Sequence, residues 1–370
     1  MAAKKERQLN YELLRIIAML MIVCLHYLSK GKILGDPARA DMGATGYTAW
    51  FIEACCIVAV NVYVLISGYF SGGKKLQALT ARAILQRPVR VWGQVITYSV
   101  LIGGIALLVG WQEFNIYQVF QYCFPLVTEH YWFATSYVVL CLLMPFLDAG
   151  IDRLQKQAFQ GLLAGLLLIF SIAKTILPMQ LPWDKGGYDA YWFVILYLTG
   201  AYSKRYGISL FSNRMRGLLV YLASELAIFA SFVGLRFIFF RTGSFAAMLH
   251  YAYTYNHLLC YIGSIGLFMA FQETSQTQQR LEYYKKPIKY LSSATFGVYL
   301  LHEHANIRDK WYLLSDNGAV STLTVPAFLV RLVLTVFLVY SVCTIIELLR
   351  QKVVTIIKGF LKNNVRECDY

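Results

Sequence analysis

Apolar stretches long enough to cross a lipid bilayer recur along the whole chain and are separated by short polar segments. A helix needs about 20 mostly apolar residues to cross the hydrocarbon core, and the sixth stretch is the shortest. The pattern predicts an all-α protein with one domain, whose core covers residues 10–350 and contains about ten transmembrane helices. These are expected at 11–29, 48–70, 88–110, 131–147, 158–177, 190–203, 216–235, 254–271, 290–304 and 324–349.

Composition agrees with a membrane protein and bears on its partners. Hydrophobic residues make up 58% of the 370 residues and charged residues only 15%, which is unlike a soluble domain. The net charge of +14 could indicate nucleic acid, but the Lys and Arg residues stand in short clusters between apolar stretches, as topology determinants do. We therefore expect the lipid bilayer as a partner and no nucleic acid.

The basic clusters also predict the orientation of the chain. Lys and Arg are dense before the first stretch and in every second loop after it, and sparse in the loops between. Basic loops remain in the cytoplasm. Both termini are therefore expected to be cytoplasmic, which requires an even number of spans.

The first stretch carries an arginine and a histidine, Arg15 and His26, in an otherwise apolar segment. Eleven positions at roughly 100° per residue return to nearly the same helix face, about 16 Å further along the axis. The predicted topology places Arg15 near the cytoplasm and His26 near the outer surface. Two interpretations stay open: both side chains reach the membrane surfaces, or they are functional, because ionisable groups within spans are costly.

Other polar residues inside predicted spans receive a depth from the topology. Glu53, His302 and Arg331 fall at a depth similar to that of His26, so we expect them to converge, with Glu53 between a histidine and Arg331. An interfacial carboxylate is the alternative for Glu53. Asn61 is expected to bond between helices, because an unsatisfied amide in hydrocarbon is costly.

The ninth stretch carries a polar stripe. Its members must face other helices or water rather than lipid, since they follow spacings of three, four and three. Glu303 and His304, directly beyond the stripe, are expected to be solvated. The stripe consists of Ser292, Thr295, Tyr299 and His302.

Two further segments allow a binding role or a simpler one. Arg87 and Arg90 flank Pro88 where the third stretch leaves the cytoplasm, which suits either a phosphate site or a topology anchor. Trp132 closes an aromatic outer segment and could contact a substrate or belong to an interfacial aromatic belt.

Several of these segments, taken in order, resemble the acyltransferase-3 family of integral membrane O-acyltransferases over residues 10–350. They are the Arg15 and His26 pair, ISGYF in the second stretch, RPVR at the third, HYWFATSYVVLCLLMPFL across the fourth and FGVYLLH in the ninth. The resemblance implies a multi-pass protein of a bacterial cell membrane that moves an acyl group, usually acetyl from cytoplasmic acetyl-CoA, to a hydroxyl of a cell-surface or lipid-linked glycan. It implies that His26 is the essential histidine, Arg15 its companion, and Arg87 and Arg90 the arginines on the donor side. No metal is expected.

The residues suit this chemistry. A neutral imidazole at His26 can act as general base on a glycan hydroxyl, with Glu53 or a water-mediated partner fixing its tautomer. His302 is expected to be a further catalytic residue. The side chains expected to contact the acceptor are Trp132, Tyr299, Asn61 and Arg331. A secondary transporter or glycan flippase would also carry ionisable residues inside a bundle, but the sequence has no internal repeat. A membrane-bound O-acyltransferase of the unrelated histidine type is the other alternative.

Overall fold

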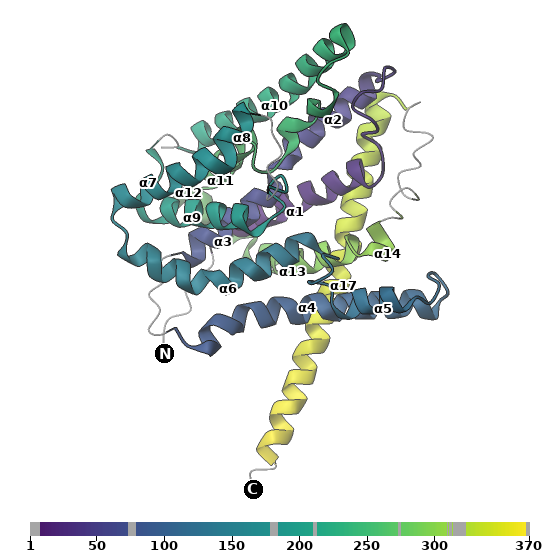
Figure 1. Cartoon of the computed structure of the whole chain (residues 1–370). Coiled ribbons are helices and arrows are strands. Elements are labelled where there is room, and N and C mark those ends of the chain that lie inside the picture. Colours follow the sequence, from purple (N-terminus) through teal and green to yellow (C-terminus); the bar gives the residue numbers. More distant parts are fainter. Residues whose placement is uncertain are drawn as a thin grey trace.

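The computed structural model describes residues 8–72, 79–177, 184–209, 213–272, 275–308, 310, 313 and 323–367, and within these ranges the chain is helical without strands. The predicted all-α class is confirmed. The longer helices form one bundle, and α17 projects beyond it toward the C-terminus (Figure 1). These helices are α1 (Leu9–Ser29), α2 (Ala44–Ile57), α3 (Ala59–Ser71), α4 (Ala81–Leu108), α6 (Trp132–Arg153), α7 (Lys156–Leu167), α9 (Ala190–Tyr206), α10 (Arg214–Thr242), α11 (Leu258–Ala270), α13 (Lys285–His302) and α17 (Val325–Glu367). The short elements are α5 (Ile116–Cys123), η1 (Leu168–Ile172), α8 (Ala173–Ile176), η3 (Ala246–Met248), η4 (Tyr251–Tyr253), α12 (Ser275–Glu282) and α14 (Ala305–Arg308).

Seven helical segments of the described chain are long and apolar enough to cross a membrane. Helices also occupy the three other predicted stretches, but α9 has 17 residues, α11 has 13, and α13 begins with three lysines in five residues. The predicted count of ten spans is therefore not confirmed, and the side of the membrane on which the termini lie stays a prediction. The seven segments are Leu9–Ser29, Ala44–Ser71, Ala81–Leu108, Trp132–Arg153, Lys156–Ile176, Arg214–Thr242 and Val325–Phe360.

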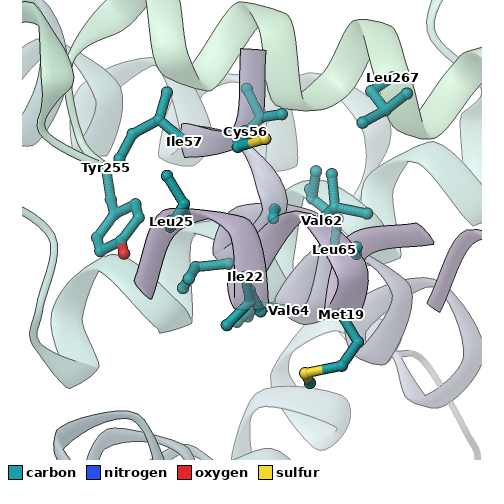
Figure 2. Close-up of a cluster of buried hydrophobic side chains, with 14 of the residues drawn as sticks. Met19, Ile22, Leu25, Cys56, Ile57, Val62, Val64, Leu65, Tyr255 and Leu267 are labelled. Carbon is teal, nitrogen blue, oxygen red and sulfur yellow. The ribbon is translucent and has the colours of Figure 1, made fainter. Parts of the chain in front are cut away.

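Helix α1 lies at the centre of the bundle. It packs against α2, α3, α13 and α17, and most of its apolar side chains are buried. Figure 2 shows Met19, Ile22 and Leu25 in a row along α1, with Tyr255 beside Leu25. The helix that carries Arg15 and His26 is thus held by neighbours on several sides, which fixes the direction of both side chains.

Two glycines allow α3 and α9 to approach very closely. A Cβ atom on Gly68 would lie 2.1 Å from the carbonyl oxygen of Tyr197, and one on Gly200 would lie 2.3 Å from that of Leu65. Small residues at such crossings let two helix backbones come into contact, which is how membrane helices gain packing energy. Gly68 belongs to the ISGYF segment, so this part of the sequence has a packing role.

A second contact region contains a buried carboxylate that lies between three helices. Glu347 of α17 accepts hydrogen bonds from Tyr98 of α4 at 2.5 Å and from Arg350 at 2.7 and 2.8 Å. A Cβ atom on Gly297 of α13 would lie 2.3 Å from Oε2 of Glu347. The carboxylate of Glu347 is buried and both of its oxygens accept hydrogen bonds, the condition under which a charge inside a protein is tolerated. It holds α4 against α13 and α17.

The crossing of α3 and α9 predicts the effect of a single methyl group. Gly68→Ala should lower the free energy of unfolding by about 1–3 kcal/mol, since the added carbon has no room beside the Tyr197 backbone. The measurement is the thermal unfolding midpoint of purified protein in detergent. Gly104→Ala is the matched control, because a Cβ there meets nothing within 4 Å. Equal midpoints for the two variants would contradict the close crossing.

Candidate active site

A cavity of about 330 Å³ follows α1 from Arg15 to His26. The α1 residues that line it begin at Glu12 and end at His26, a distance of about 21 Å along a helix. This volume over such a length makes a narrow passage. It has an arginine near one end and a histidine near the other, so the predicted common face of Arg15 and His26 is confirmed.

The polar stripe of α13 faces this cavity. Ser292, Thr295 and Tyr299 line it, and all three are buried. His302, the last member of the stripe, contacts the ring of His26. The predicted inward orientation of the stripe is therefore confirmed.

His26 is held through one of its two ring nitrogens. Its Nδ1 lies 2.9 Å from Nε2 of His302 and 3.2 Å from Oε2 of Glu303. The other nitrogen of His302, Nδ1, lies 2.6 Å from the carbonyl oxygen of Val298. Two polar groups at the end of α13, His302 and Glu303, thus lie beside a single atom of α1, and the Val298 carbonyl holds His302 in turn.

These contacts fix where the protons lie on two neutral rings. A carbonyl oxygen only accepts, so His302 Nδ1–H donates to Val298 and His302 Nε2 carries a lone pair. His26 Nδ1–H then donates to that lone pair, and a carboxylate at Glu303 favours the same proton position. Nε2 of His26 is left unprotonated. It makes no hydrogen bond within the described part of the chain, and the ring lines the cavity.

The prediction that Glu303 and His304 are solvated is wrong. Glu303 is 2% exposed and His304 is fully buried. Helix α13 ends at His302, and the chain then turns into the bundle, where His304 Nε2–H donates to the carbonyl of Ser99 at 3.2 Å. Arg308 lies 3.7 Å from the carboxylate of Glu303. The hydrophobicity pattern predicts that this segment lies at the membrane surface. It contains no information on the inward turn of the chain.

The predicted convergence around Glu53 is also wrong. Glu53 is buried, but the acid beside His26 is Glu303, and Oε2 of Glu53 has no hydrogen-bond partner among the described residues. No ion pair joins Glu53 to Arg331 in the part of the chain that the structure describes. Arg331 lines a different cavity on α17, together with Pro326 and Thr335. Topology gave these residues a common depth, but it carried no information on the face of the bundle to which each one points.

The other end of the cavity carries an ion pair between Arg15 and Glu12. Arg15 donates to Oε1 of Glu12 at 2.7 Å and remains partly exposed, and the hydroxyl of Tyr63 donates to the Arg15 carbonyl. Arg15 and Arg87 both lie within electrostatic range of the Tyr137 hydroxyl, which belongs to the cavity lining. Sequence reasoning missed Glu12, although its position three residues before Arg15 on one helix face was the available signal.

Arg87 and Arg90, which the sequence placed on the donor side, are exposed residues near the start of α4. Arg87 contacts Sδ of Met144 at 3.0 Å. Neither arginine is in the cavity lining. Their side chains are thus accessible beside the Arg15 end, with Val91 of the same helix forming part of the wall.

The residues expected at the acceptor separate into two groups. Trp132 and Tyr299 line the cavity. Asn61 does not: its amide donates to the Tyr255 carbonyl at 2.8 Å and its oxygen accepts from Trp192 Nε1 at 2.9 Å. The predicted interhelical bonding of Asn61 is confirmed, and its fully buried side chain is used by those bonds rather than presented to a substrate.

The separation of Glu53 and Arg331 predicts that their substitutions are independent. The effects of Glu53→Gln and Arg331→Met on unfolding free energy should add in the double variant to within about 0.5 kcal/mol, as for residues without shared partners. The measurement is a double-mutant cycle of unfolding in detergent. A double variant that regains the stability lost in the single ones would mean that the two side chains pair after all.

Comparison with known families adds to this geometry. No curated protein and no solved structure matches the chain. Residues 8–347 match the family model of an acyltransferase domain, Acyl_transf_3. That range contains both ends of the cavity, the whole of α13 and α17 as far as Glu347. The chain therefore belongs to the acyltransferase-3 family and is a membrane acyltransferase.

Proposed function

We propose that the protein transfers an acyl group, in the first place acetyl, from acyl-CoA to a hydroxyl of a cell-surface or lipid-linked glycan, with His26 as general base. The observation that carries this proposal is the ring of His26 in the cavity lining, with Nδ1 held by His302, while Arg15 lies in the lining at the other end. A hydroxyl is a poor nucleophile near neutral pH. A positioned base overcomes this and contributes typically ~10²–10⁴-fold to the rate.

The proposed reaction needs only one base. Nε2 of His26 removes the hydroxyl proton as the acceptor oxygen attacks the thioester carbonyl carbon. The carbon–sulfur bond then breaks, the CoA thiolate leaves, and the imidazolium returns the proton to sulfur. The products are the acyl ester and free CoA, and His26 ends in its starting state.

His302 and Glu303 are the positioning residues in this mechanism. Nε2 of His302 accepts from Nδ1 of His26, and Oε2 of Glu303 lies 3.2 Å from the same nitrogen, so both favour the tautomer in which Nε2 of His26 is the base. The carboxylate of Glu303 also stabilises the imidazolium that forms when Nε2 takes the proton. Arg308, 3.7 Å from that carboxylate, favours its ionised form.

Arg15, Arg87 and Arg90 are proposed to hold the nucleotide end of the donor. Charge-assisted contacts from guanidinium groups are the strongest hydrogen bonds to phosphate, and all three side chains are partly or fully exposed near one end of the cavity. The pantetheine arm would then extend through the narrow passage along α1. In the predicted orientation the donor enters from the cytoplasm and the glycan lies outside. The passage would then bring the thioester to His26 from the side opposite to the glycan.

The base assignment predicts distinct effects for two amide substitutions. His26→Gln should reduce transfer of radiolabelled acetyl from acetyl-CoA by ~10²-fold or more, because glutamine cannot take a proton. Glu303→Gln should lower kcat and leave the donor KM unchanged, since it alters only the groups that orient and stabilise His26. Turnover with purified protein and a crude glycan acceptor fraction measures both.

His250→Gln is the matched control, because His250 is exposed and lies outside the cavity lining. It should keep the rate of the unaltered protein. Each variant is compared at equal amounts of folded protein. Full transfer by His26→Gln would exclude a base at this position and with it the proposed mechanism.

A further inference from the structure

Three aromatic side chains from separate parts of the chain pack against one another, and two of them line the same cavity as His26. The ring centroids of Trp132 and Tyr188 are 4.4 Å apart, and those of Tyr188 and Tyr255 are 4.7 Å apart. The centroids of Trp132 and Tyr255 are 5.7 Å apart, with an angle of 21° between the ring planes. Trp132 begins α6, Tyr188 precedes α9, and Tyr255 precedes α11. We call these three side chains the aromatic wall.

The aromatic wall connects the cavity with the surface. Trp132 and Tyr255 line the same cavity as His26, and Tyr255 lies beside Leu25, the neighbour of His26 on α1 (Figure 2). Tyr188 is 41% exposed. The wall therefore extends from the cavity lining, through Trp132 and Tyr255, to a tyrosine that is exposed.

A tight turn holds Tyr188 in the wall. Gly186 and Gly187 have φ angles of +72° and +85°, which side chains rarely adopt. A Cβ atom on Gly187 would lie 2.8 Å from Cβ of Tyr255, so only glycine allows the turn to approach this closely. The backbone N–H of Tyr255 donates to the Gly186 carbonyl at 3.0 Å.

The turn is fixed further by a buried ion pair. Asp184 accepts from the backbone N–H of Gly186 and from the side chain of Asn256, each at 2.8 Å, and Lys174 lies 2.5 Å from its second oxygen. Lys174 and Asp184 are both about 95% buried. Aromatic residues of a membrane-interface belt need only to reach the lipid headgroups. They do not need a fixed turn or a buried ion pair to hold them in one orientation.

We propose that the aromatic wall binds a pyranose ring of the acceptor glycan by stacking. The face of a pyranose presents C–H groups, whose positive hydrogens suit the negative face of an aromatic ring. The hydroxyls project from the ring edge and stay free, so one of them can reach Nε2 of His26. The wall contains no charged side chain, which fits a neutral ring. This inference rests on the proposed function, because it names the binding site of the same acceptor.

The experiment measures sugar binding directly and without turnover. Purified protein in lauryl dimethylamine oxide, a detergent with no sugar headgroup, is titrated by calorimetry with cellotetraose and with chitotetraose. Sorbitol, an acyclic polyol, is the ligand control. The unaltered protein should bind at least one oligosaccharide saturably and sorbitol not at all.

Variants then assign the binding to the wall. Tyr188→Leu should weaken oligosaccharide binding about 2- to 10-fold, which corresponds to one aromatic contact, whereas Tyr188→Phe keeps the ring and should bind as the unaltered protein does. If Tyr188→Leu lowers the unfolding midpoint, Trp132→Leu is the second test and should also weaken oligosaccharide binding. Tyr191→Leu, at an exposed tyrosine outside the wall, is the matched control.

The outcomes separate this inference from the proposed function. No saturable binding of either oligosaccharide, or equal binding by Tyr188→Leu, Trp132→Leu and the unaltered protein, would overturn the role of the wall. Acetyl-CoA binding is measured on the same unaltered sample. Sugar binding that depends on the wall, together with an inability to bind acetyl-CoA, would contradict the proposed acyl transfer and leave the sugar site standing.

Discussion

The hydrogen bond between the rings of His26 and His302 is the interaction on which the site depends. Because His302 gives its own Nδ1 proton to the Val298 carbonyl, it can only accept from His26, and the free nitrogen of His26 is thereby determined. The bond joins α1 to the end of α13, so its 2.9 Å length requires these two helices to keep their relative position. Packing of α1 in the centre of the bundle is therefore a condition for the chemistry as well as for the fold.

Other contacts help to keep α1 and α13 in this relative position. The glycine crossing of α3 and α9 stabilises the core on one side of α1. The Glu347 network fixes α4 against α13 and α17 on another. Both lie away from His26, yet both form walls around the helices that bring His26 and His302 together. The buried charge of Glu347 is tolerated because Tyr98 and Arg350 lie at hydrogen-bonding distance.

Sequence reasoning succeeded where helical periodicity decides the answer. The common face of Arg15 and His26 and the inward stripe from Ser292 to His302 followed from residue spacing alone, since both residue sets lie on single helices. It failed where the answer depends on how different helices are rotated about their axes. Glu53 and Arg331 were predicted at a similar depth, but their side chains point to different parts of the bundle.

Local chain direction was the other source of error. Glu303 and His304 were expected to be solvated, because the predicted topology placed them beyond the polar stripe, nearer the membrane surface than His302. In the structure the chain turns inward, and Glu303 becomes the acid beside His26. Trp132 was expected at the acceptor, but its packing with Tyr188 and Tyr255 could not be predicted, because the three rings come from segments separated by more than fifty residues and meet only through the Gly186–Gly187 turn.

The most direct test of the central claim is an experimental structure with a bound, unreactive donor analogue. In acetonyl-CoA a methylene group separates the sulfur from the carbonyl, so the ligand is one carbon longer than acetyl-CoA and cannot transfer its acyl group. Cryo-electron microscopy should find its carbonyl at Nε2 of His26, its arm along α1 and its phosphates beside Arg15 and Arg87. An analogue bound outside this cavity, or with its carbonyl remote from His26, would contradict the account.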